Sequence, residues 1–142
     1  MIVIILSIIL FVIFTILGSF HLYWFLGGIW GLEKVIPSKS EKASTISIPK
    51  FATLIVSATL FLFGVFYLIK SELIIVATPN GIANYIYWFI PSVFILRAIG
   101  EFKYVGFFKK IKNTEFAKAD TKLFSPLCLI IGFIGFIILL IH

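Results

Sequence analysis

The chain has 142 residues, of which 61% are hydrophobic and 13% are charged, and its formal net charge is +6. Soluble globular domains carry roughly 45–50% apolar and about 25% charged residues, so this composition excludes a soluble enzyme, a disordered regulator and a disulfide-stapled secreted module. A chain of this length is typical of one domain, and we expect a single domain over residues 1–142 that is solvated by lipid.

Four apolar runs are long enough to cross a bilayer, which takes about 20 helical residues. The first, Ile2–Phe25, has no basic start and is too long for a cleaved signal peptide. The second follows Pro49, the third contains Pro91 as a kink site, and the fourth begins near Ser125-Pro126. We expect an all-α, four-helix transmembrane bundle with helices over about 2–26, 50–70, 82–104 and 123–141.

Between the second and third runs, Pro79-Asn80-Gly81 predicts a turn. Residues 73–78 before it form either an extension of the second helix or an interfacial stub, and their periodicity is compatible with both.

Lysine positions predict how the bundle is oriented. Ten lysines lie in two connections, the one between the first and second helices and the one between the third and fourth. They are Lys34, Lys39, Lys42 and Lys50, then Lys103, Lys109, Lys110, Lys112, Lys118 and Lys122. Basic residues in short loops stay cytoplasmic, so we expect a plasma (inner) membrane protein whose first and third connections are cytoplasmic and whose termini are both extracytoplasmic. The expected partners are membrane lipids and not nucleic acid, because the lysines are concentrated in the connections at one predicted face of the membrane, where they would meet anionic lipid.

Several polar and aromatic residues are predicted to gather at the cytoplasmic end. If the third helix continues to 104, Arg97, Glu101 and Tyr104 share one face. Arg97 needs a partner in the bilayer, with Glu101 the nearest in sequence and Glu33 and Asp120 the alternatives. Two interpretations stay open: a snorkelling arginine that joins helix ends, or a polar pocket for a ligand headgroup. The candidate ligand-binding residues are His21, Trp24, Trp30, Glu33, Arg97, Glu101, Tyr104 and Asp120.

His21 precedes Tyr23 and Trp24, aromatic residues typical of a membrane interface. It fits a hydrogen-bonded interfacial residue, and a role in proton transfer is the alternative. The other histidine, His142, is expected at the opposite membrane face, so the sequence predicts no metal site, and no cofactor is expected.

Small residues recur on single helix faces. Ser125, Cys128, Gly132 and Gly135 share one face of the fourth helix, and Thr53, Ser57 and Gly64 form a similar stripe on the second. Such faces let membrane helices approach closely, so we expect packing there. Gly27 and Gly31 are expected to shape a turn around Trp30.

Three segments together carry a family resemblance: HLYWFLGGIWGLE at 21–33, LRAIGEFKYVGFF at 96–108 and DTKLFSPLC at 120–128. They resemble a family of small bacterial four-helix integral membrane proteins catalogued as a domain of unknown function. The resemblance implies the same four-helix membrane architecture and no assigned activity.

The leading functional hypothesis is a membrane protein that binds a lipid-like or amphipathic ligand at its cytoplasmic end. In it, Arg97 holds an anionic group, while Trp24 and Trp30 wall the pocket. One alternative is an isomerase-like acid–base enzyme in which His21 and Glu101 exchange protons, although no recognised catalytic motif is present. Another is a structural or immunity-type subunit with a protein partner or a second copy of the chain.

Overall fold

The computed structural model describes residues 1–35 and 49–142, apart from the side chains of Glu33 and Asn80. The long helices are α1 (Ile2–Phe25), α3 (Lys50–Lys70), α4 (Asn80–Ile99) and α6 (Ser125–Ile141), and α2 (Leu32–Val35) is a short helix after α1. Before α6 come α5 (Glu115–Ala119) and the π-helix η1 (Asp120–Phe124), so the last three elements run as one continuous helix. Four helices of the described chain are long and apolar enough to span a membrane, and no strand occurs there, which confirms the predicted all-α membrane fold.

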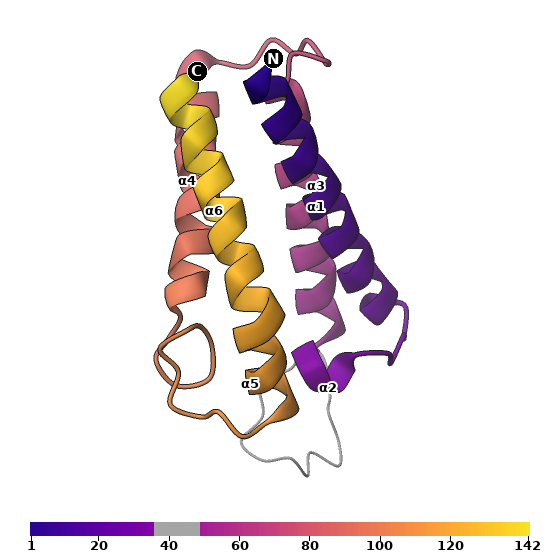
Figure 1. The fold of residues 1–142 in the computed structure, drawn as a ribbon. Coiled ribbons are helices and arrows are strands. Elements are labelled where there is room, and N and C mark those ends of the chain that lie inside the picture. Colours follow the sequence, from indigo (N-terminus) through magenta and orange to yellow (C-terminus); the bar gives the residue numbers. More distant parts are fainter. Residues whose placement is uncertain (36–48) are drawn as a thin grey trace.

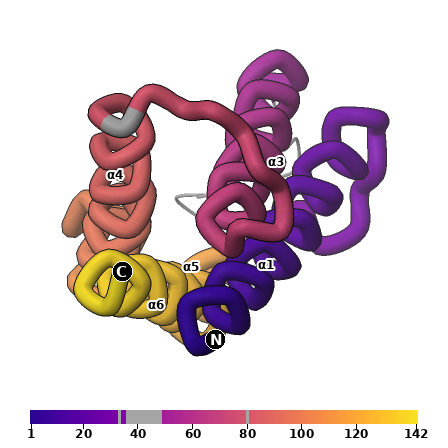
Figure 2. The backbone as a smooth tube through the Cα atoms, turned by 90° about the horizontal axis from the view of Figure 1, so that it is seen from above, coloured from indigo at the N-terminus to yellow at the C-terminus, as the bar shows by residue number. Residues whose placement is uncertain are grey.

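The helices form two antiparallel pairs, α1 with α3 and α4 with α6, and α1 also contacts α6 (Figures 1 and 2). Both termini and the α3–α4 connection lie at one end of the bundle, which we name the terminal end. The opposite end carries α2, α5 and the α4–α5 connection, and is named the basic end. Which membrane face each end meets stays a prediction. Lys39, Lys42 and the side chain of Glu33, all counted above, lie outside the described residues.

Small residues bring the helices of each pair together, as their spacing predicts. Between α1 and α3, the Ser57 hydroxyl donates a hydrogen bond of 2.8 Å to the carbonyl of Gly18. Between α4 and α6, a Cβ added to Gly135 would lie 2.7 Å from the Cβ of Pro91. Larger side chains at these positions would push the helices apart, which confirms that the small faces serve packing.

Aromatic rings fill the space between the two pairs. Phe14 of α1 stacks on Tyr67 of α3 with ring centroids 5.9 Å apart, and its centroid is 5.3 Å from that of Phe94 in α4. Leu10, Ile90 and Ile131 complete the contacts at 0% exposure. Because this core joins residues from all four long helices, the two pairs form one bundle.

Two predicted helix boundaries are wrong at the basic end. Helix α4 ends at Ile99 and not near 104, because Gly100 adopts φ 84° and turns the chain away from the helix axis. The last helix starts earlier than 123, since Thr114 caps α5 by accepting a hydrogen bond from the backbone N–H of Ala117 at 3.1 Å.

Helix α3 ends at Lys70, so residues 73–78 are not part of it. Ser71 terminates the helix with a backbone N–H bond to the carbonyl of Tyr67, and Glu72 then adopts φ 61°. The connection that follows is irregular and largely exposed.

Candidate functional site

Asp120 is the centre of a buried ionic cluster at the basic end. Its side chain is 0% exposed and one carboxylate oxygen, Oδ1, accepts a 2.6 Å bond from Nη2 of Arg97. The other, Oδ2, accepts from Nζ of Lys109 at 3.0 Å, from the backbone N–H of Gly106 at 2.8 Å and from the Ser125 hydroxyl at 3.1 Å. We name these five residues the Asp120 cluster; it joins α4, the α4–α5 connection, η1 and α6.

The π-helix explains how Asp120 and Ser125 meet. The backbone N–H of Ser125 bonds to the carbonyl of Asp120, a step of five residues that is wider than an α-helical turn. In an α-helix, positions five apart point in different directions. The wider turn directs both side chains to one side, and the hydroxyl reaches the carboxylate.

The α4–α5 connection reaches the cluster because it folds back on the end of α4. The backbone N–H of Phe107 bonds to the carbonyl of Ala98 at 2.9 Å. Gly100 and Gly106 both have positive φ and lie so close that a Cβ on Gly106 would be 2.6 Å from Cα of Gly100. Only glycine fits this approach, and it delivers the N–H of Gly106 and the side chain of Lys109 to Asp120.

Lys109 was not predicted as a site residue. Its side chain is 1% exposed and its ammonium group also bonds to the carbonyl of Gly106 at 3.0 Å and the hydroxyl of Thr121 at 2.6 Å. All three donors of the ammonium group therefore have partners. In the sequence, Lys109 is one of ten lysines in the two connections, and no motif or spacing distinguishes it from the others.

The structure selects Asp120 as the partner of Arg97 and not Glu101, the nearest in sequence. The predicted shared face of Arg97, Glu101 and Tyr104 is wrong, because α4 ends at Ile99 before it reaches the last two. Glu101 is exposed, and its carboxylate accepts the backbone N–H of Tyr104 at 3.2 Å. Arg97 is part-exposed, and its second terminal nitrogen, Nη1, is buried without a hydrogen-bond partner.

A second region at the basic end is an open groove along the last turns of α1. Its volume is about 530 Å³, and it is lined by Thr15, Ile16, Ser19, Phe20, Tyr23 and Trp30. The rings of Phe20 and Trp30 lie 6.1 Å apart and nearly parallel. We name it the aromatic groove.

The turn after α1 places Trp30 against the groove. Gly27 adopts φ 103°, and the chain folds back so that the Trp24 indole N–H donates to the carbonyl of Trp30 at 2.9 Å. The Tyr23 hydroxyl accepts from the backbone N–H of Trp30 at 3.4 Å. This confirms that glycines shape a turn around Trp30, whose side chain stays 70% exposed.

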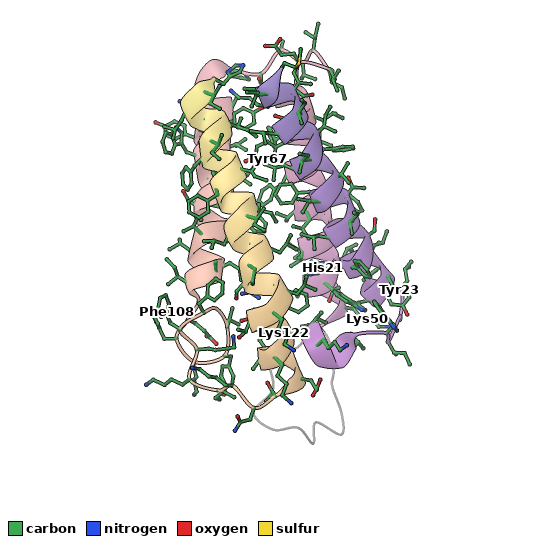
Figure 3. The ribbon with its side chains drawn as sticks, viewed as in Figure 1. His21, Tyr23, Lys50, Tyr67, Phe108 and Lys122 are labelled. Atoms are coloured by element: carbon green, nitrogen blue, oxygen red, sulfur yellow. The ribbon has the colours of Figure 1, made fainter. Side chains whose placement is uncertain are left out.

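His21 lies beside the groove and on α1, as Figure 3 shows with Tyr23. Its Nδ1 is 2.8 Å from the carbonyl of Leu17, and its ring meets the Trp24 ring edge-on at 5.2 Å. No described carboxylate contacts its ring. The arrangement is that of a hydrogen-bonded residue in an aromatic cluster.

Five of the eight predicted site residues thus fall into two groups at one end of the bundle, whereas Glu101 and Tyr104 belong to neither and the side chain of Glu33 lies outside the described residues. One group contains Arg97 and Asp120, and the other contains His21, Trp24 and Trp30. Among the described residues, no hydrogen bond, ion pair or ring contact joins the two groups. Figure 3 shows His21 and Tyr23 on α1 and Phe108, in the connection that follows α4, at the other edge of the bundle.

Metal-binding side chains do not gather in the described part of the chain, where no three His, Cys, Asp or Glu residues come together. The Asp120 cluster offers charge pairing, and the aromatic groove offers apolar surface.

Comparison with known proteins identifies a family without an assigned activity. A family model described as "Protein of unknown function (DUF3995)" matches residues 14–134, which include the Asp120 cluster and the aromatic groove. Searches of curated proteins and of solved structures find no significant match.

Proposed function

The chain belongs to the family described as "Protein of unknown function (DUF3995)", and from this premise we propose that it is a membrane protein that binds a lipid-like or amphipathic ligand in the aromatic groove. The observation that carries the proposal is the groove itself, about 530 Å³ of open space beside a membrane-spanning helix.

The lining of the groove suits an amphipathic molecule. Ile16 and Phe20 offer apolar surface to a hydrocarbon chain, and the exposed ring of Trp30 offers a flat face beside them. Tyr23 adds a hydroxyl group near the turn after α1. Amphipathic rings of this kind are enriched where hydrocarbon meets headgroups, so the chain of the ligand lies along α1 and its head lies near Tyr23.

Arg97 has a different role in this proposal from the one that the sequence suggested. Its Nη2 is engaged by Asp120, and no described contact joins it to the groove residues. We assign Arg97 to the positioning of α4 against η1, and the ligand to the aromatic groove alone.

A binding titration tests the proposal. Nitroxide-labelled stearic acid is added to the purified full chain in mild detergent, and the bound fraction is read from its electron paramagnetic resonance spectrum. Trp30→Ala should weaken binding about ten-fold, since a buried aromatic contact contributes on the order of 1.5 kcal/mol. Trp88→Ala is the matched control, because Trp88 is also an exposed tryptophan but lies on α4. Equal binding by native protein and Trp30→Ala would refute the proposal.

The acid–base alternative has no supporting contact in the described residues. It needs His21 within hydrogen-bond reach of a carboxylate, whereas His21 bonds to the carbonyl of Leu17 and Glu101 contacts Tyr104. A stoichiometric protein that co-purifies with the chain would instead favour the partner-subunit alternative.

We also propose that the basic end is cytoplasmic and that the membrane is the plasma membrane. The support is that Lys34, Lys50 and the exposed lysines of the α4–α5 connection lie at that end, whereas Lys70 is the only lysine within the described ranges that lies at the other. A reporter fused to either terminus should be located outside the cytoplasm. A cytoplasmic location of both fused reporters would refute this orientation.

A further inference from the structure

The α4–α5 connection, residues 100–114, has an exposed aromatic surface that neither the Asp120 cluster nor the aromatic groove uses. Phe102, Phe107 and Phe108 are 56%, 40% and 64% exposed, and the rings of Phe102 and Phe108 lie 6.4 Å apart. Figure 3 places Phe108 at the outer edge of this loop. Clustered, exposed phenylalanines mark a surface that is covered by something other than water.

The loop is built to hold these rings outward. Phe102 has φ 68°, a conformation that is costly for a bulky side chain and persists only where the surroundings impose it. The surroundings are the close contact of Gly100 with Gly106 and the buried anchor of Lys109 on Asp120. Because Lys109 points inward, its neighbours Phe108 and Lys110 are left on the exposed surface.

Positive charge surrounds the exposed rings. The backbone N–H groups of Lys110 and Ile111 both bond to the carbonyl of Lys103, at 3.2 and 3.0 Å. These bonds bring Lys103 and Lys110 close together, although they are separated in the sequence. Lys103, Lys110 and Lys112 are exposed, against the single exposed carboxylate of Glu101 in the segment 100–112. The surface therefore combines apolar rings with a net positive charge.

The position of the loop identifies the occupant. It follows Ile99 directly, where the membrane-spanning helix α4 ends, so it emerges at the level of the lipid headgroups. We propose that the loop is a membrane-surface anchor: Phe102 and Phe108 insert among the headgroups of the leaflet at the basic end, and Lys103, Lys110 and Lys112 select anionic phospholipid. Rings with basic residues beside them are the features of interfacial binding, and each lysine near an anionic surface adds about a five-fold preference.

A spin label can report the depth of the loop. Cys128 is the only cysteine of the chain, so Cys128→Ser gives a background in which Phe107→Cys carries a nitroxide while Phe102 and Phe108 stay intact. The full chain is reconstituted in vesicles of phosphatidylcholine, with or without phosphatidylglycerol. Collision with oxygen relative to a water-soluble nickel chelate is then measured.

With the native loop, the label should be shielded from nickel in both kinds of vesicle. The shielding should be stronger in vesicles that contain phosphatidylglycerol, because the label then lies deeper. Phe102→Ser with Phe108→Ser should expose it to nickel in both. Lys103→Gln, Lys110→Gln and Lys112→Gln together should keep the depth in phosphatidylcholine and lose the phosphatidylglycerol-dependent shift. Lys34→Gln is the control, an exposed lysine of the same end outside the loop, and it should keep the shift.

Two outcomes would overturn the proposal. One is a native label that nickel reaches equally in both vesicles, and the other is a phosphatidylglycerol-dependent shift that survives the triple lysine substitution. Phe108→Ser alone, followed by circular dichroism, provides a milder variant if the double serine variant does not fold. Binding of nitroxide-labelled stearic acid should be unchanged in all loop variants. The depth measurement therefore tests the anchor proposal, and the binding measurement separately tests the proposal for the aromatic groove.

Discussion

The Asp120 cluster and the aromatic groove lie at the same end of the bundle but differ in how their polar atoms are used. In the cluster, a carboxylate of 0% exposure accepts four hydrogen bonds from four different residues. In the groove, the Ser19 and Thr15 hydroxyls donate to carbonyls of their own helix, and the aromatic rings face open space.

The difference predicts that substitutions in the cluster change stability and that substitutions in the groove change the proposed binding. A buried carboxylate with two cationic partners is costly to disturb, because removal of one partner leaves an uncompensated charge. An exposed indole such as that of Trp30 can be removed at little cost to folding, yet it offers surface to a ligand. Arg97 and Asp120, which first suggested a ligand site, instead help to hold α4, the α4–α5 connection and η1 together.

Among the variants that compare the two regions, Asp120→Asn should cause the largest loss of stability. It leaves Lys109 buried without a counter-charge, so we expect the free energy of unfolding to fall by about 3–5 kcal/mol. Denaturation of the purified protein followed by circular dichroism measures it. Glu115→Gln is the control, since Glu115 forms an exposed pair with Lys118 at 3.4 Å and its substitution should cost under about 0.5 kcal/mol. Equal stability of both variants would mean that the cluster is not structural.

A pair of glycine variants compares the backbone of the two regions. Gly106→Ala places a Cβ against Gly100 in a loop with positive φ, and we expect a loss of about 2–4 kcal/mol and faster proteolysis of residues 100–112. Gly27→Ala, in the turn beside the groove, also has positive φ but meets nothing within 4 Å. It should cost only about 1–2 kcal/mol. Similar losses would show that the close approach of Gly100 and Gly106 is unimportant.

Arg97→Ala should lower the free energy of unfolding by less than Asp120→Asn. Asp120 keeps Lys109, the N–H of Gly106 and the Ser125 hydroxyl, so we expect a loss of about 1.5–3 kcal/mol, the contribution of a hydrogen bond to a charged group. Binding of nitroxide-labelled stearic acid should be unchanged. Loss of that binding in a folded Arg97→Ala protein would contradict the division into two regions.

Trp30→Ala should have the smallest effect on stability. Because the Trp30 side chain is 70% exposed, the free energy of unfolding should change by less than about 0.5 kcal/mol, while stearic acid binding weakens. A large loss of stability in the same denaturation experiment would assign Trp30 to the folded core instead of the groove.

The helices could be predicted from the sequence because their cause is local. Uncharged apolar runs such as Ile2–Phe25 are stable in lipid only as helices, in which every backbone group is satisfied within the segment. The small faces at Ser57 and Gly135 could also be read, since helical spacing places their members together. The end of α4 could not, because the positive φ of Gly100 depends on its contact with Gly106.

The candidate site was only partly predictable for the same reason. Arg97 and Asp120 were both identified as residues that need partners, and Asp120 was one of three alternatives. Lys109 was missed, because burial of one lysine among ten depends on how residues 100–112 fold back. The aromatic turn at Trp30 was found, because glycines beside it and aromatic residues before it lie within one short stretch of chain.

The sequence by itself determined that this protein spans a membrane with four helices and that its positive charge gathers at one end, since apolar length and lysine position act on each segment separately. Only the tertiary structure decided which charges pair and which aromatic rings stay open. The Arg97–Asp120 pair joins residues 23 positions apart. Its geometry depends on the packing of α4 on α6, the widened turn of η1 and a glycine-dependent loop, none of which any one segment specifies.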